Sequence, residues 1–315
     1  MIKHLTIVLA AALMLFGCGS TGGGFIVTKP LLKLVVSASK KNAKYNTFAD
    51  SCEKRIAVPY VKEGDPAQVL DIYYAPAENR KNAVLIDVHG GFYVAGSRES
   101  NRPFASAFLK EGYDVVLLEY RLNDGKRSVS DELGDCAAAL DYLATNSEEL
   151  GLNKGSMFLT GDSAGGHLVL YMAEGTGDSS VPVRPKMFAP RGVLVNCPAY
   201  DFASFSNPKV FSKGALEWFI GPKYADREWL ESMSPRTFVA SYKGPLFIST
   251  CTNDFIREQA LMLKAERDSL GCPAVLLDIE SDDKKVAHVH NVISPGLPES
   301  QNVNSAMVDF MNGLL

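Results

Sequence analysis

Residues 157–170 read MFLTGDSAGGHLVL and contain the pattern G-x-S-x-G, with Ser163 at its centre. The residues on either side predict a strand over 157–160 and a helix over 165–174. A strand, a sharp turn and a helix form the context in which this pattern marks a nucleophilic serine. Glycine is needed there because the turn brings backbone close to backbone and pushes the hydroxyl outward. The alternative is a phosphate-binding loop, which is disfavoured because no Walker-type lysine follows.

A second glycine motif lies upstream. His89-Gly90-Gly91-Phe92 directly follows the apolar run at residues 83–88. Acyl transfer passes through a tetrahedral oxyanion, which two or three backbone N–H groups stabilise by a few kcal/mol. Glycines permit the loop conformation that points those groups inward. The alternative is a simple turn at the end of a strand, but the position upstream of Ser163 favours an oxyanion loop.

Strands and helices alternate from Arg55 onward. The expected strands are 56–61, 69–74, 83–88, 115–119, 157–160, 193–195, 246–250 and 275–279, and the expected helices are 131–144, 165–174, 256–270 and 300–315. This alternation predicts an α/β fold with a mostly parallel central sheet covered by helices on both faces. Residues 200–243 interrupt the rhythm with many aromatic residues, and they predict a small cap insertion rather than a plain surface excursion.

With these motifs, the chain from about Arg55 to its C-terminus resembles the α/β-hydrolase superfamily. It is most similar to serine esterases with an H-G-G loop and a G-D-S-A-G-G elbow, namely hormone-sensitive-lipase-like esterases and exported bacterial carboxylesterases and acetyl esterases. Residues 120–122, YRL, match the same family. Two departures leave the subfamily and its acyl pocket open. Residues 123–125 are NDG where the lipase-like branch has Ala-Pro-Glu, and Phe92 stands where glycine is common.

The resemblance implies a catalytic triad in the chain order serine, acid, histidine. Ser163 is the nucleophile, and Asp254 follows the strand after which the family carries its acid. Glu258 is the reserve acid, in the helix that follows. His288 matches the family's histidine, and His290 takes the position where the family has an aromatic residue. Asp254 is also a candidate N-cap for that helix, a role compatible with catalysis.

The implied oxyanion hole consists of the N–H groups of Gly90, Gly91 and Ala164. The resemblance also implies supporting polar residues around the site, namely His89, Tyr120, Arg121, Asp135, Asp162 and His167. No cofactor is expected.

A metal site is the alternative role for His288 and His290, together with Asp282 and Asp283. Nothing in the sequence completes a three-ligand set around them, and the triad needs one of the two histidines. No metal is therefore expected.

Composition excludes several classes of protein. The chain has 315 residues, of which 46% are hydrophobic and 22% charged, with a formal net charge of −4. These are values of an ordinary globular protein and exclude a collagenous, low-complexity or generally disordered chain. The slightly negative charge, without a long basic stretch, argues against non-specific nucleic-acid binding.

The N-terminus predicts export. Lys3 precedes an apolar run over residues 5–16, which is too short to span a bilayer and matches the core of a signal peptide. The run ends in Leu15-Phe-Gly-Cys18, which resembles the bacterial lipobox and implies that Cys18 is lipidated. The alternative is a plain signal peptide with an incidental cysteine.

The expected organisation is a signal peptide at 1–17, a tether and N-terminal helix at 18–54, and a catalytic domain at 55–315. Five cysteines remain after Cys18, an odd number without a C-x-x-C motif, so buried free thiols are expected rather than a disulfide framework.

The expected protein is therefore a serine carboxylic-ester hydrolase of the bacterial cell envelope, periplasmic or associated with the outer membrane. It acts on small, acetylated or carbohydrate esters, and its contacts are the substrate and, through the lipid, a membrane. No obligate protein partner is evident. The alternatives are a serine peptidase of the same fold, for which the chain leaves little room for an accessory domain, and a non-catalytic binding lipoprotein. The complete set of triad residues argues against the second alternative.

Overall fold

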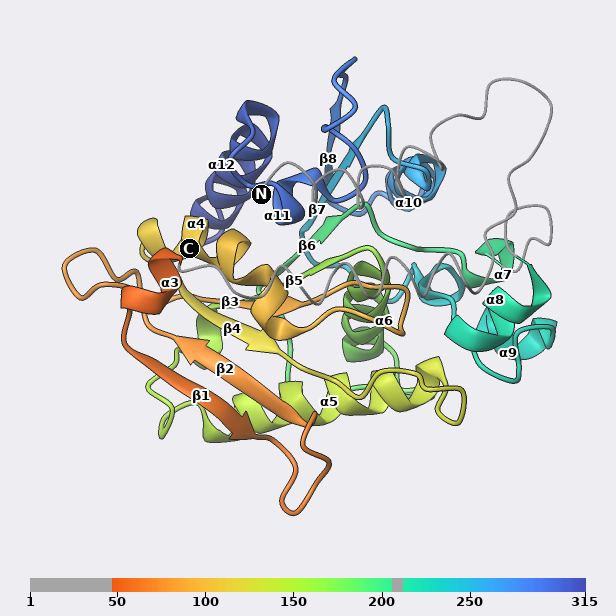
Figure 1. The fold of residues 1–315 in the computed structure, drawn as a ribbon, viewed down its shortest axis with the longest axis horizontal. Helices are drawn as coiled ribbons and strands as arrows, with labels where there is room; N and C mark the ends of the chain where they lie inside the picture. Colours follow the sequence, from red (N-terminus) through yellow and green to blue (C-terminus); the bar gives the residue numbers. More distant parts are fainter. Residues whose placement is uncertain (1–46, 206–211) are drawn as a thin grey trace, which may run out of the picture.

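The computed structural model describes residues 47–205 and 212–315. Its centre is an eight-stranded sheet in the order β1-β2-β4-β3-β5-β6-β7-β8 (Figure 1). The strands are β1 (Lys54–Pro59), β2 (Val69–Tyr73), β3 (Val84–Val88), β4 (Asp114–Leu118), β5 (Met157–Asp162), β6 (Gly192–Asn196), β7 (Leu246–Cys251) and β8 (Ala274–Ile279). β2 runs antiparallel to both β1 and β4, and every other pair is parallel. The predicted α/β-hydrolase fold is confirmed, as are all eight expected strands, with shifts of a few residues at their ends.

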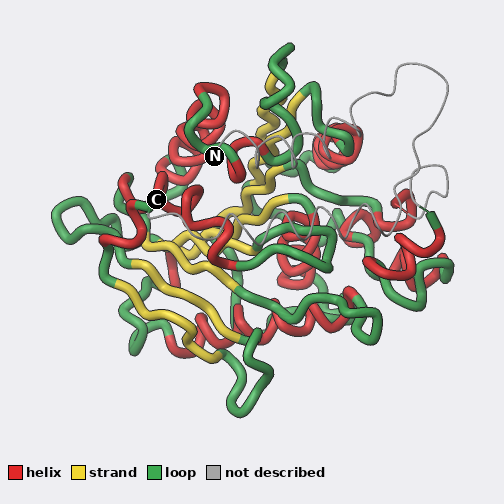
Figure 2. The backbone as a smooth tube through the Cα atoms, viewed as in Figure 1, coloured by secondary structure: helices red, strands yellow, loops and turns green. Residues whose placement is uncertain are grey.

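Helices cover both faces of the sheet. They are α3 (Phe48–Ser51), α4 (Arg102–Lys110), α5 (Val129–Asn146), α6 (Ala164–Gly177), α7 (Phe202–Phe205), α8 (Lys213–Phe219), α9 (Arg227–Ser232), α10 (Arg257–Ser269), α11 (His290–Ile293) and α12 (Pro298–Asn312), with short 3-10 turns η2 (Arg98–Asn101), η3 (Lys154–Ser156) and η4 (Pro235–Phe238). Figure 2 shows these helices around the strands of the central sheet.

Two apolar clusters form the core, one on each face of the sheet. Every residue of β3, β4, β5 and β6 is buried, as expected for parallel strands between two helical layers. Because side chains alternate along a strand, Ile86 contacts the cluster that contains α5 and α6, and Leu85 contacts the cluster that contains α4 and α12. The sheet is therefore held rigidly at its centre, where β5 ends.

Helix α5 begins earlier than the apolar periodicity predicts because its first turn is capped. The Ser128 N–H donates to Asp131 Oδ2 at 2.8 Å, and the two residues form a reciprocal capping box. This cap lets the helix begin at Val129, two residues before the expected start.

Residues 200–243 leave the sheet between β6 and β7 and contain α7, α8, α9 and η4. In Figure 1 these helices gather at one end of the molecule, away from β1. We call residues 200–243 the excursion. Its first residues are hydrogen-bonded to α10, because Gln259 Oε1 accepts the N–H groups of Tyr200 and Asp201 at 3.2 and 2.7 Å. Arg236 also bridges Asp201 and Glu266, at 2.9 and 2.8 Å.

The fold extends upstream of the expected domain start at Arg55. Within α3, the Ala49 N–H donates to Ser106 Oγ at 3.2 Å, and Asp50 pairs with Arg102 at 2.8 Å. These contacts fix α3 on α4.

The predicted signal peptide, Cys18 and residues 18–46 of the expected tether and N-terminal helix lie outside the described residues. Within the described ranges, none of the helices combines the length and apolar character that crossing a membrane requires. The five cysteines within those ranges are free thiols, four of them buried.

Candidate active site

Ser163 sits at a strained turn between β5 and α6. Its backbone has φ 55° and ψ −117°, a conformation that non-glycine residues rarely adopt. The glycines around it are required sterically, since a Cβ on Gly165 would lie 2.0 Å from the Val88 carbonyl oxygen, and one on Gly161 would lie 2.5 Å from the Gly165 oxygen. The Ser163 N–H donates to the Asn196 carbonyl at 2.9 Å, which holds the turn against β6.

The structure brings Ser163, His288 and Asp254 together in one chain of hydrogen bonds. His288 Nε2 lies 2.9 Å from Ser163 Oγ, and its Nδ1 lies 2.6 Å from Asp254 Oδ1. The three residues come from the loops after β5, β7 and β8, at the carboxyl edge of the parallel strands. This arrangement allows the imidazole to accept the serine proton while the carboxylate orients the ring.

The hydrogen bonds of Asp254 favour its ionised form although the side chain is buried. Its Oδ2 accepts the Thr250 hydroxyl at 2.8 Å, and its Oδ1 also accepts the Ile256 N–H at 3.1 Å. Burial raises the pKa of Asp254, but His288 and these hydrogen bonds outweigh that effect and hold the pKa below its ordinary value. A charged Asp254 stabilises the imidazolium that forms when His288 takes a proton.

The loop that carries His288 is fixed from behind. Val289 has φ 52°, a strained value for a β-branched residue. Two residues later, the Asn291 side chain donates to Asn196 Oδ1 at 2.8 Å and to Asn304 Oδ1 at 3.1 Å. These buried bonds connect the loop to β6 and α12, so the position of the imidazole is determined by the core.

The other residues considered for the triad lie elsewhere. His290 Nδ1 is 2.9 Å from Ser300 Oγ, and burial lowers the pKa of His290 to about 4. It is therefore a neutral, structural histidine at ordinary pH. Glu258 is exposed in the first turn of α10.

The loop of Gly90 and Gly91 after β3 lies against the serine turn. Of the three N–H groups expected to form the oxyanion hole, one is already hydrogen-bonded. A Cβ on Gly90 would lie 3.1 Å from Ser163 Cβ. The Gly90 N–H itself donates to Asp162 Oδ1 at 3.1 Å, so it would have to leave that carboxylate to bind an oxyanion. The Ala164 N–H is the first of α6 and has no partner within the helix. No acceptor for the Gly91 N–H is found among the described residues.

His89 anchors this loop through both ring nitrogens. Its Nδ1 lies 2.8 Å from the Gly90 oxygen, and its Nε2 lies 3.3 Å from Glu119. The ring stacks on Tyr120 at 4.4 Å between centroids, and the Tyr120 hydroxyl donates to the His89 carbonyl at 2.8 Å. Burial alone would lower the pKa of His89, but Glu119 raises it above its ordinary value.

The other expected supporting residues act further away. Arg121 forms a bidentate ion pair with Asp135, with hydrogen bonds of 2.8 and 2.7 Å. His167 Nε2 is 2.8 Å from the Met233 carbonyl and joins α6 to the excursion.

The expected supporting residue Asp162 belongs to a buried polar cluster whose other members, Asp87 and Asn101, the sequence patterns do not reveal. The Asn101 side-chain amide donates to Asp87 Oδ2 at 2.9 Å and to Asp162 Oδ1 at 3.0 Å. Burial, followed by the neighbouring Asp162, raises the pKa of Asp87 to about 8. Burial also raises the pKa of Asp162. No local spacing signals this cluster, because its members are brought together only by the sheet.

A row of three aromatic rings begins beside His288. The Phe255 ring is 4.4 Å from the His288 ring, and Phe92 stacks on Phe255 at 6.0 Å. Phe92 also meets Phe219 of α8 edge-on at 6.1 Å. Phe92, at the position where glycine is common in similar esterases, thus becomes part of an aromatic wall that reaches His288 through Phe255.

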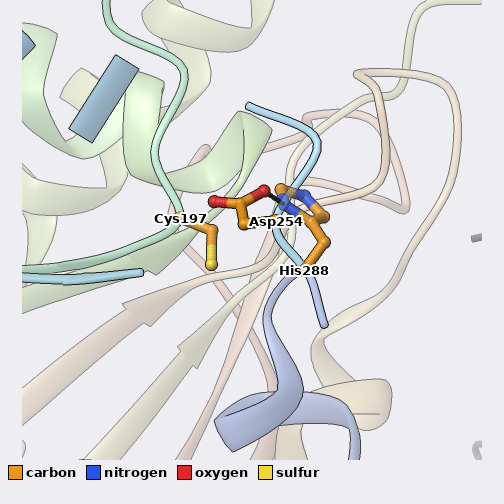
Figure 3. A group of neighbouring side chains, drawn as sticks. All are labelled: Cys197, Asp254 and His288. Carbon is orange, nitrogen blue, oxygen red and sulfur yellow. Dashed lines mark hydrogen bonds and ion pairs between the residues drawn. The ribbon is translucent and has the colours of Figure 1, made fainter. Parts of the chain in front are cut away.

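Cys197 is a further neighbour of the triad that the sequence patterns did not reveal. One ligand atom each of Cys197, Asp254 and His288 lie within 4.8 Å of one another, as Figure 3 shows for the side chains. Within residues 47–205 and 212–315 this is the only group of three or more His, Cys, Asp or Glu residues with such spacing. Asp282 and Asp283 are not part of it, so the structure does not assemble the alternative metal site considered from the sequence.

Comparison with known proteins gives a family model and named relatives. The BD-FAE family model matches residues 70–264, more than half of the chain. An ethyl acetate hydrolase of Pseudomonas putida is 31% identical over 60% of this chain and 56% of its own length. A carboxylesterase of Mycobacterium tuberculosis is 24% identical over 59% of this chain and 61% of its own length. The matched region thus spans less than two thirds of either relative.

Solved structures share the fold. Esterase B from Lactobacillus rhamnosis is 22% identical, with a TM-score of 0.78 over 100% of this chain and 96% of its own. A bacterial heroin esterase is 21% identical, with a TM-score of 0.71 over 98% and 97%. At these identities the likeness concerns the fold.

Proposed function

Because the chain belongs to the BD-FAE family and is a carboxylesterase-type hydrolase with the α/β-hydrolase fold, we propose that it cleaves small carboxylic esters through a Ser163–His288–Asp254 triad and a covalent acyl-enzyme. The observation that carries this proposal is the continuous chain of hydrogen bonds, 2.9 and 2.6 Å long, from Ser163 Oγ through His288 to Asp254.

The proposed reaction has two halves. His288 Nε2 takes the proton of Ser163 as Oγ attacks the ester carbonyl, and the N–H groups of Gly91 and Ala164 donate to the oxyanion. The alcohol then leaves with the proton from His288. Water attacks the acyl-enzyme with His288 again as the base, which restores the serine.

Short acyl groups, acetyl among them, are the proposed substrates. Phe255 contacts His288, and Phe92 and Phe219 continue the row of aromatic rings away from it, a bulk that would limit the room for a long chain. A relative named as an ethyl acetate hydrolase agrees with this size. Acetylated carbohydrates belong to the same chemical class and are a further candidate.

The test is hydrolysis of p-nitrophenyl esters from acetate to decanoate. We expect wild type to prefer the short esters and Ser163→Ala to lose nearly all of the rate. Ser269→Ala is the matched control, because Ser269 is an exposed serine at the end of α10. If Ser163→Ala keeps the wild-type rate, the triad proposal is wrong. If wild type does not exceed buffer on any ester, the ester substrates are wrong and peptide substrates come next.

We also propose that Cys18 is lipidated and anchors the protein in a bacterial cell envelope. The support is the apolar run at residues 5–16 and the Leu15-Phe-Gly-Cys18 sequence. The test is detergent phase partitioning and mass spectrometry of the protein expressed in a bacterium. Wild type should enter the detergent phase with an acylated N-terminal cysteine, and Cys18→Ala should not. An aqueous, unacylated wild type would refute the anchor.

A further inference from the structure

Cys197 lies where the chain leaves β6, directly behind the triad. Its backbone has φ 46°, and its side chain is buried. Its Sγ accepts the N–H of Val289 at 3.2 Å, so the sulfur touches the residue next to the catalytic histidine. The proposed reaction uses none of these features.

The three side chains together offer a donor set for a metal ion. A thiol, an imidazole nitrogen and a carboxylate oxygen, all buried, lie within 4.8 Å of one another. Figure 3 shows the Asp254 carboxylate between the His288 ring and Cys197. Thiolate and imidazole favour Zn²⁺ and other thiophilic divalent cations, whereas Mg²⁺ and Ca²⁺ prefer oxygen ligands alone.

Neighbouring groups would also hold Cys197 and Asp254 in place as metal ligands. The Val289 N–H donates to the sulfur and would stabilise its thiolate form, although burial and the neighbouring Cys251 raise the pKa of the Cys197 thiol, so the ion has to displace the proton. The Thr250 hydroxyl holds the second Asp254 oxygen at 2.8 Å. Such outer contacts orient ligands in metal sites.

We propose that Cys197, Asp254 and His288 form an inhibitory site for a thiophilic divalent cation, with Zn²⁺ as its representative. The ion binds the Cys197 sulfur, an Asp254 oxygen and His288 Nδ1. The Cys197 thiol proton is released to solvent, the Nδ1 proton is replaced by one on Nε2 so that His288 stays a neutral imidazole, and no atom changes its oxidation state.

Geometry makes this site inhibitory. Zinc bonds of about 2.0–2.1 Å to nitrogen and oxygen at tetrahedral angles place the two ligand atoms about 3.3–3.4 Å apart. His288 Nδ1 and Asp254 Oδ1 are 2.6 Å apart, so they must separate by about 0.7–0.8 Å to admit the ion. The ion then replaces the hydrogen bond that orients His288 toward Ser163. This inhibitory effect rests on the proposed esterase function, whereas binding of the ion does not.

Binding is therefore tested first, without substrate. Metal-free protein is titrated with Cd²⁺, whose bond to a thiolate absorbs in the near ultraviolet, and the signal is then competed with Zn²⁺. We expect one ion per chain for wild type and an affinity at least about tenfold weaker for Cys197→Ala. Cys197→Ser is the second variant, because it keeps an acceptor for the Val289 N–H if the alanine variant does not fold. Cys52→Ser, which removes the half-buried thiol, is the control and should bind as wild type does.

The second arm measures hydrolysis of a short p-nitrophenyl ester. The rate of each variant with metal is compared with its own metal-free rate. We expect Zn²⁺ to lower the wild-type rate at least about tenfold, a chelator to restore it, and the two Cys197 variants to resist. Absence of a thiolate–Cd²⁺ signal in wild type, or equal binding by the Cys197 variants, would overturn the site. Binding without any effect on a measurable rate would overturn its inhibitory role. Binding by a protein that hydrolyses no ester would leave the site standing and refute the proposed function instead.

Discussion

Replacing Asp87 by asparagine should stabilise the protein, and the gain should grow with pH. Asp87 lies on β3 with 1% of its surface exposed, and its Oδ1 has no hydrogen-bond partner among the described residues. Burial and the nearby Asp162 raise the pKa of Asp87 from 3.8 to about 8. Asparagine has the shape of the protonated acid and keeps an oxygen for the Asn101 amide, but it never has to be charged.

The magnitude follows from the difference in protonation. Between pH 4 and pH 8 the folded state keeps a proton on Asp87 that the unfolded state has lost, so the stability contributed by this group falls as the pH rises. Each pH unit in this window costs wild type about 1.4 kcal/mol, whereas Asp87→Asn does not incur this cost. From pH 5 to pH 8 the difference in unfolding free energy should shift toward the variant by about 3–4 kcal/mol.

Urea unfolding of both proteins at pH 5, 6, 7 and 8 measures this shift. Asp282→Asn is the control, because Asp282 is exposed and its removal should change stability equally at each pH. A difference between wild type and Asp87→Asn that stays constant from pH 5 to pH 8 would show that Asp87 is ionised throughout, and the reasoning would be refuted.

Four further substitutions test the site, its turn and the interior of α5. Asp254→Asn should lower kcat/KM on short esters about 10³–10⁴-fold without unfolding the protein, and a loss below tenfold would contradict the triad. Gly165→Ala should destabilise by more than about 2 kcal/mol, because its Cβ would lie 2.0 Å from the Val88 oxygen. Gly134→Ala, in the interior of α5 with no atom within 4 Å of the added Cβ, should stabilise by about 1 kcal/mol in the same unfolding assay. Phe92→Ala should raise the rate on decanoate relative to acetate several-fold, and an unchanged ratio would exclude Phe92 as a limit on chain length.

Strands and the serine turn could be predicted from the sequence because their signals are local. The runs that form β3 to β7 are mostly apolar, and the glycines that flank Ser163 lie two residues from it on either side. Helix α4 is not among the expected helices, and Pro103 lies in its first turn, where the missing N–H costs nothing.

Contacts between distant segments could not be predicted in the same way. Asn101 meets Asp162 across 61 positions, and Cys197 meets Val289 across 92. Neither pair has a spacing that a sequence pattern can recognise, because both depend on how the parallel strands are ordered. The hydrogen bond from the Gly90 N–H to Asp162 could not be predicted either, because the two residues lie 72 positions apart.

The excursion between β6 and β7 leaves and rejoins the body at a base clamped to α10 by Gln259 and Arg236. Ser163 and His288 are held by contacts of the sheet and of α12, below that clamp. Insertions, deletions or exchanges beyond the clamp that keep Phe219 and Met233 in place can therefore alter what reaches the site without disturbing Ser163 and His288. In evolutionary terms, selection can diversify the substrates of this protein and preserve its chemistry independently.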